Sequence, residues 1–185
     1  MNIKKIITII LIMVSALTGC GKSDSDKVKD NSQVTQENHG RVEEETVETL
    51  VAKFNTEVVD NSSLNPASTD YLTESNNEYW YGLIEGIYLV AVPKKYTGDK
   101  AADIVNYTLL YVNKTGEYES DVASYVKHLI KANNNQITDS EIDTLLKEAK
   151  TKPNSGEAAN NGKGISVGYT ENEEKYQYQV LRLYK

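Results

Sequence analysis

The order of hydrophobic patterns along residues 42–185 is the feature that most limits the fold of this chain. A segment with apolar residues at helical spacing comes first, strand-like runs follow, two more helical segments come next, and two strand-like runs end the chain. Helical and strand patterns bury different faces, so this order predicts one α+β domain. We expect an antiparallel sheet of about four or five strands, with a two-helix unit inserted before a C-terminal β-hairpin.

The N-terminal helix is predicted over residues 43–58. Glutamates occupy positions 43–45, where the dipole of a helix that starts there would favour acidic residues. The polar stretch 61–70 contains Pro66 and is expected to be a loop. The apolar residues that recur at helical spacing are Val47, Leu50, Val51, Phe54 and Val58.

Strand-like segments lie on both sides of the two-helix unit. Residues 78–93 are dense in aromatic and β-branched side chains, and Glu85–Gly86 forms either a tight hairpin turn or a bulge in one long strand. Residues 103–113 alternate between apolar and polar. Two further strands, 164–170 and 175–184, are expected to be joined by the polar turn between them.

The two inserted helices are predicted at about residues 118–132 and 139–150. Thr138 and Glu141 have the spacing of a capping box at the start of the second helix. Ile137 and Ile142 are placed to form its hydrophobic staple.

The segment around the loop between these helices partly matches the residue spacing of a calcium-binding EF-hand loop. Asn134, Ile137 and Glu141 match its fifth, eighth and twelfth positions. Ile130 and Ala132 would then occupy the first and third positions, where calcium requires oxygen ligands. We therefore interpret the segment as a capped helix start and expect no metal.

The first 20 residues have the pattern of an export signal. Lys4 and Lys5 precede the apolar run 6–17, which is too short to span a bilayer comfortably. The sequence Leu-Thr-Gly-Cys ends at Cys20 and resembles the lipobox of bacterial lipoproteins. This resemblance implies cleavage after residue 19 by signal peptidase II and a diacylglyceryl group on Cys20. The alternative is an ordinary secretory signal followed by a free cysteine.

The resemblance implies a lipid-anchored protein on the extracytoplasmic face of the cell membrane, which the bilayer holds through acylated Cys20. The high content of Lys, Asn and Tyr is typical of a low-GC genome such as that of a Gram-positive bacterium. The polar residues 20–41 are expected to form a flexible tether. Cys20 is the only cysteine, so the folded part has no disulfide and no thiol nucleophile.

Charge and composition exclude several functions. The net charge of −7 becomes −9 when Lys4 and Lys5 are removed with the signal, and no basic stripe is present for nucleic acid. His128 lies off the apolar stripe of its predicted helix and is expected at the solvated surface. With no second His or Cys in the folded part, a transition-metal site lacks ligands. We expect no cofactor and identify no catalytic residue.

Tyrosines on the strands are the candidate binding residues. In a strand, Tyr79 and Tyr81 face one side and Trp80 the other, while Tyr176 and Tyr178 share one face of the last strand. If exposed, Tyr79, Tyr81, Tyr176 and Tyr178 form a partner-binding face, because a rigid amphipathic ring loses little entropy on binding. The alternative is that these tyrosines are strand formers with hydroxyls at the rim.

The sequence thus favours a binding or accessory module of the cell envelope that recognises an envelope protein or a glycan. A small envelope hydrolase or a structural spacer is the alternative, and an enzyme is the less favoured class.

Overall fold

The structure is a computed structural model that describes residues 41–184 apart from residues 69, 72, 76 and 115–118. The expected signal peptide, Cys20 and the tether up to residue 40 lie outside the described residues. The first half of the domain contains α1 (Val47–Asn61), β1 (Thr73–Ser75), β2 (Glu78–Ile84), β3 (Ile87–Pro93) and β4 (Val105–Asn113). The second half contains α2 (Glu119–Asn133), α3 (Asp139–Thr151), β5 (Ala159–Asn160), β6 (Ile165–Glu171) and β7 (Lys175–Arg182).

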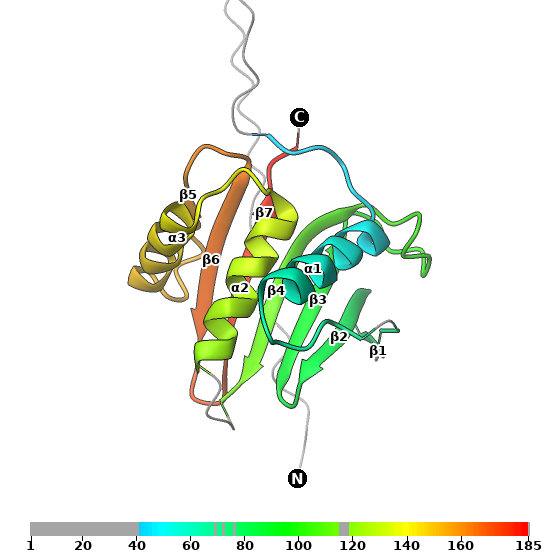
Figure 1. The fold of residues 1–185 in the computed structure, drawn as a ribbon, viewed down its shortest axis with the longest axis horizontal. Helices are drawn as coiled ribbons and strands as arrows, with labels where there is room; N and C mark the ends of the chain where they lie inside the picture. The colour runs from blue at the N-terminus through cyan, green and yellow to red at the C-terminus, as the bar shows by residue number, and fades with distance from the viewer. Residues whose placement is uncertain (1–40, 69, 72, 76, 115–118, 185) are drawn as a thin grey trace, which may run out of the picture. The chain divides into compact units, whose positions relative to one another are not determined.

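All strands join one antiparallel sheet in the order β1-β2-β3-β4-β7-β6-β5. The helices α1, α2 and α3 lie on the same face of this sheet (Figure 1). The predicted α+β class is confirmed, as is the two-helix unit before the C-terminal hairpin β6–β7. The described residues contribute seven strands, more than expected, because the short edge strands β1 and β5 have no readable alternation.

The N-terminal helix begins later than predicted. Thr46 is its N-cap, and the Thr46 side chain accepts a hydrogen bond from the backbone N–H of Thr49. The glutamates at 43–45 therefore precede the helix instead of filling its first turn. Their segment is extended because its backbone bonds elsewhere, for example from the N–H of Val105 to the carbonyl of Glu45 at 2.9 Å.

The alternatives at Glu85–Gly86 are resolved as a tight hairpin turn between β2 and β3. Ile84 pairs with Ile87, and Gly86 has a φ of 80°, a conformation that glycine adopts without strain.

The start of α3 has the predicted capping box. The backbone N–H of Thr138 donates to Glu141 Oε2 at 2.9 Å, and the Thr138 hydroxyl accepts from the backbone N–H of Glu141. Ile137 and Ile142 are both buried in the core, as expected for the predicted staple.

The core lies between the sheet and its three helices. Alternate residues of β2 and β3, such as Tyr81 and Leu89, enter the same cluster as Phe54 of α1, Leu129 of α2 and Ile142 of α3. Within the described part of the chain, no helix combines the length and the apolar character needed to span a bilayer.

Candidate binding surfaces

Tyr79 and Tyr81 do not form an exposed face, a question that the sequence left open. Both side chains are 0% exposed and belong to the core cluster beneath the helices. The predicted alternation along β2 is correct, but the tyrosines occupy the covered side and Trp80 the other. These two residues therefore hold the fold together and are not available to a partner.

Tyr79 belongs to a buried polar cluster around Asp103. Its hydroxyl donates to Asp103 Oδ2 at 2.7 Å, and Thr97 donates to the same carboxylate through its backbone N–H and its hydroxyl. Burial alone would raise the pKa of Asp103, but the hydrogen bonds from Thr97 and Tyr79 lower it below its ordinary value. The cluster satisfies a buried carboxylate, which is a structural role.

Tyr176 and Tyr178 line a groove of about 690 Å³ between the first turns of α2, the end of β6 and the start of β7. Tyr169 of β6 pairs with Tyr178, and their ring centroids lie 5.0 Å apart. Tyr176 is half-buried, with its ring 6.1 Å from that of Tyr169. We call this cavity the tyrosine groove, after Tyr169, Tyr176 and Tyr178. Of the four candidate tyrosines, Tyr176 is thus partly exposed at a surface cavity, whereas Tyr178 is 4% exposed and belongs to the core cluster.

Charged side chains stand around the tyrosine groove. Lys114 forms an ion pair with Glu171, with 2.6 Å between Nζ and Oε1. The hydrogen bonds from Lys114 and Tyr169 lower the pKa of Glu171. Lys150, in the last turn of α3, lies 5.8 Å from the Tyr178 ring centre and 6.0 Å from that of Tyr169. Within the described residues, Lys150 has no carboxylate in ion-pair contact.

The sheet face opposite the helices carries a second group of aromatic residues. Strand register aligns Trp80, Val90 and Leu109 across β2, β3 and β4, and we call the side of the sheet that they share the open face. The half-buried rings of Trp80, Tyr88 and Tyr111 on this face form the aromatic triad. Trp80 lies 5.9 Å from Tyr88 and 5.3 Å from Tyr111, both in edge-to-face geometry.

Neighbouring polar groups fix and surround the aromatic triad. Glu78 accepts a hydrogen bond from the Trp80 indole N–H at 3.0 Å, which sets the tilt of that ring. Burial raises the pKa of Glu78, and the hydrogen bond from Trp80 opposes the shift. On the adjoining strand, Lys175 lies 5.0 Å from the Tyr111 ring centre, and Gln177 pairs directly with Tyr111. The surface therefore combines rings, an amide and both signs of charge.

Another groove, of about 1200 Å³, runs between the segment 41–57 and the α2–α3 loop. Its charges pair with one another inside the protein. Buried Arg182 donates to Asn133 Oδ1 at 2.9 Å and lies 3.1 Å from Glu45 Oε2, while Lys53 approaches the other oxygen of Glu45 at 2.6 Å. This groove therefore lies where the N-terminal segment packs against the sheet.

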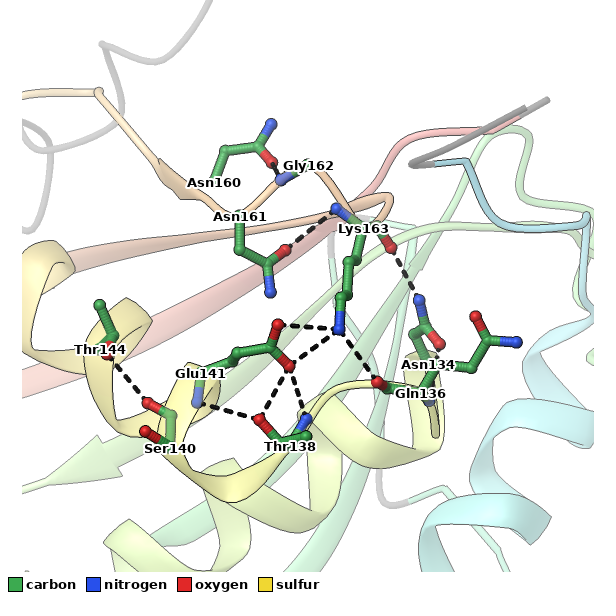
Figure 2. A network of polar contacts seen from close by, with 10 residues as sticks. All are labelled: Asn134, Gln136, Thr138, Ser140, Glu141, Thr144, Asn160, Asn161, Gly162 and Lys163. Atoms are coloured by element: carbon green, nitrogen blue, oxygen red, sulfur yellow. Dashed lines mark hydrogen bonds and ion pairs between the residues drawn. The ribbon is translucent and has the colours of Figure 1, made fainter. Parts of the chain in front are cut away.

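Glu141, at the twelfth position of the segment with partial EF-hand spacing, contacts a lysine from elsewhere in the chain. Figure 2 shows Lys163, from the turn before β6, pointing at the Glu141 carboxylate, with 2.8 Å and 3.0 Å to its two oxygens. The same ammonium group reaches the carbonyl of Gln136. Among the described residues, no group of three or more His, Cys, Asp or Glu side chains could hold a metal ion.

His128 is buried, with 7% of its surface exposed, so the expectation of a solvated histidine was wrong. Its Nδ1 lies 4.0 Å from Glu57 Oε2 of α1. Burial lowers the pKa of His128, with Lys131 acting in the same direction and Glu57 and Asp139 opposing. The apolar stripe of α2 gave the wrong prediction for His128, because α1 packs on a second side of α2 and His128 lies on that side.

The aromatic triad was missed by sequence reasoning, although its signal was present. Once Glu85–Gly86 is a hairpin turn, alternation puts Trp80 and Tyr88 on the same face of β2 and β3. Sequence patterns did not say which face the helices cover. Comparison with known proteins adds no assignment, because no family model, curated protein or solved structure matches this chain.

Proposed function

We propose that this protein is a lipid-anchored lipoprotein of the extracytoplasmic face whose domain is a binding or accessory module of the cell envelope. The single observation that carries the binding role is the aromatic triad on the open face. We assign this face, in place of the buried Tyr79 and Tyr81, as the surface that contacts an envelope protein or glycan.

The anchoring part of the proposal is supported by the Leu-Thr-Gly-Cys sequence that ends at Cys20. Its resemblance to the lipobox implies acyl chains on the mature N-terminus. Each buried methylene contributes about 0.8 kcal/mol, and two or more chains give stable membrane attachment. The roughly twenty polar residues after Cys20 would separate the domain from the bilayer by roughly 25 Å.

The binding part of the proposal is supported by the composition of the open face. Trp and Tyr rings dominate binding energy at many recognition surfaces, because they bury a large area at low entropic cost. The Glu78 hydrogen bond holds the Trp80 ring in place before a partner arrives. A ring that is oriented in advance loses less conformational freedom on binding.

Affinity capture from isolated bacterial envelopes tests this function. The chain from Gly21 onward would be immobilised, and bound protein and glycan would be identified. We expect Tyr111→Ala to reduce capture by roughly tenfold or more, which is the effect of removing a central aromatic contact. Val59→Ala serves as the control, because Val59 is 61% exposed on the helical side. Equal capture by both variants would show that the partner binds elsewhere.

A further inference from the structure

The tyrosine groove has the properties of a second, separate binding site. Its volume of about 690 Å³ lies inside the range of roughly 300–1000 Å³ that is usual for small-molecule sites. Its lining includes the half-buried rings of Tyr169 and Tyr176, the edge of the buried Tyr178 ring, and Val122 and Ala123 of α2. A ligand that fits this cavity therefore needs a flat face that can pack on rings.

The polar groups of the groove specify more of the ligand. Asn113 and Ser120 line it together with Lys114, Lys150 and Glu171. The charged members are two lysines and one glutamate, which gives the lining a formal charge of +1 in a chain whose net charge is −7. A locally positive cavity in an acidic protein attracts an anion.

Lys150 is the group available to that anion. Lys114 is already paired with Glu171 at 2.6 Å, whereas Lys150 lies over the Tyr169 and Tyr178 rings and, among the described residues, within ion-pair distance of no carboxylate. Its positive charge still acts on Glu171, whose pKa it helps to lower after the larger effects of Lys114 and Tyr169. The turn after α3 is tied to β6, because the Asn154 side chain bonds the backbone N–H and carbonyl of Glu171, each at 2.9 Å. This attachment holds the end of α3, and with it Lys150, beside the groove.

We infer that the tyrosine groove binds a sugar unit that carries one anionic group, either a carboxylate or a phosphate. The apolar face of the sugar ring packs on the half-buried rings of Tyr169 and Tyr176. Its hydroxyls bond to the polar lining, and the anion pairs with Lys150. Two observations carry this inference, namely the ring-lined cavity and its positive charge. Neither depends on the aromatic triad, which lies on the other side of the sheet.

Isothermal titration of the full-length chain in detergent micelles tests the site. The probes are glucuronic acid and glucose 1-phosphate, and glucose and inorganic phosphate each supply only one half of the required chemistry. We expect saturable binding of at least one anionic sugar. Glucose and inorganic phosphate should each bind at least roughly tenfold more weakly than that sugar. The stronger of the two anionic probes identifies carboxylate or phosphate as the preferred group.

A matched pair of lysine variants locates the binding. Lys150→Gln should weaken the affinity for the anionic sugar by roughly tenfold or more. Lys147→Gln, an exposed lysine of the same helix that does not line the groove, should leave the affinity unchanged. Trp80→Phe should also leave the affinity for the anionic sugar unchanged. The titration therefore tests the tyrosine groove separately from the proposed binding role of the open face.

Three results would overturn the inference. They are the absence of saturable binding by either anionic sugar, equal binding of glucose, and equal effects of Lys150→Gln and Lys147→Gln.

Discussion

Trp80 and Glu78 connect a titratable group to the aromatic triad through one hydrogen bond of 3.0 Å. Trp80 is the only tryptophan in the chain, so tryptophan emission reports on the surroundings of this one side chain. Burial raises the pKa of Glu78 above its ordinary value of 4.5. The carboxylate therefore gains its proton earlier than usual as the pH falls.

The first prediction is a pH-dependent change of Trp80 fluorescence. Protonation of Glu78 weakens the charge-assisted hydrogen bond from the indole, so emission should shift with a midpoint above pH 4.5. Glu78→Gln carries no charge and should remove this transition. A midpoint at or below pH 4.5, or an unchanged transition in the variant, would contradict the assigned contact.

The second prediction concerns Tyr79, whose hydroxyl donates to buried Asp103. Tyr79→Phe removes one donor from a buried carboxylate, and we expect a loss of about 1–3 kcal/mol in the free energy of unfolding. Urea denaturation measures this loss. Tyr88→Phe, at the half-buried triad, should cost less than about 0.5 kcal/mol. The two variants should therefore differ in stability, and similar values would show that Tyr79 is no more important to the core than Tyr88.

At this scale, the sequence correctly predicted the alternation along β2 and left open which side of the strand is buried. The period of two in a strand shows that Trp80 opposes Tyr79 and Tyr81, but the position of the helices decides which set is buried. The prediction that His128 is solvated was wrong because its burial comes from packing against α1, a contact between elements distant in the sequence.

At the scale of elements, the start of α3 shows how local sequence can specify structure. Thr138 and Glu141 satisfy each other's backbone donors, and Lys163 from the turn before β6 adds an ion pair to the same carboxylate. These contacts lower the pKa of Glu141 to about 2, with the hydrogen bond from Lys163 as the largest cause. The lowered pKa makes the stability of this helix start depend on pH.

The third prediction follows from that lowered pKa. The folded-state pKa lies below the ordinary value of 4.5, so Glu141 stabilises the fold above pH 4.5 and loses this contribution as the pH falls toward about 2. Glu141→Gln can keep the capping geometry but not the charge. Urea midpoints across this range should fall less steeply for the variant than for the original chain. Equal slopes would mean that the ion pair with Lys163 adds no stability.

The elements themselves were largely predictable, because periodicity and capping act over a few residues. The bounds of α2 and α3 lie within about one residue of those expected. The start of α1 was misplaced, since the extended conformation of residues 43–45 depends on pairing with distant segments. The two-residue strand β5 gave no signal for the same reason.

At the scale of the whole molecule, the sequence predicts a lipid anchor at Cys20, and the structure describes a folded domain that follows it. The described residues bury most of their apolar side chains between the sheet and the helices, without a disulfide, since the only cysteine is Cys20. The net charge of −7 makes the positive tyrosine groove a local exception in this chain.

The fourth prediction tests the anchor. Cys20→Ala removes the sulfur that would carry the diacylglyceryl group, so the variant should not be processed by signal peptidase II or carry acyl chains. Metabolic labelling with a fatty acid should mark the original chain and leave the variant unlabelled. Labelling of both chains, or unchanged processing of the variant, would contradict the lipoprotein assignment.

The binding role of the open face is tested most directly by the fluorescence of Trp80 during titration with solubilised envelope material. The account predicts a saturable change in emission for the original chain and for Val59→Ala, and a much weaker response for Tyr111→Ala. The contradicting result is capture of an envelope component by the chain with no change in Trp80 emission, because binding would then occur away from the aromatic triad.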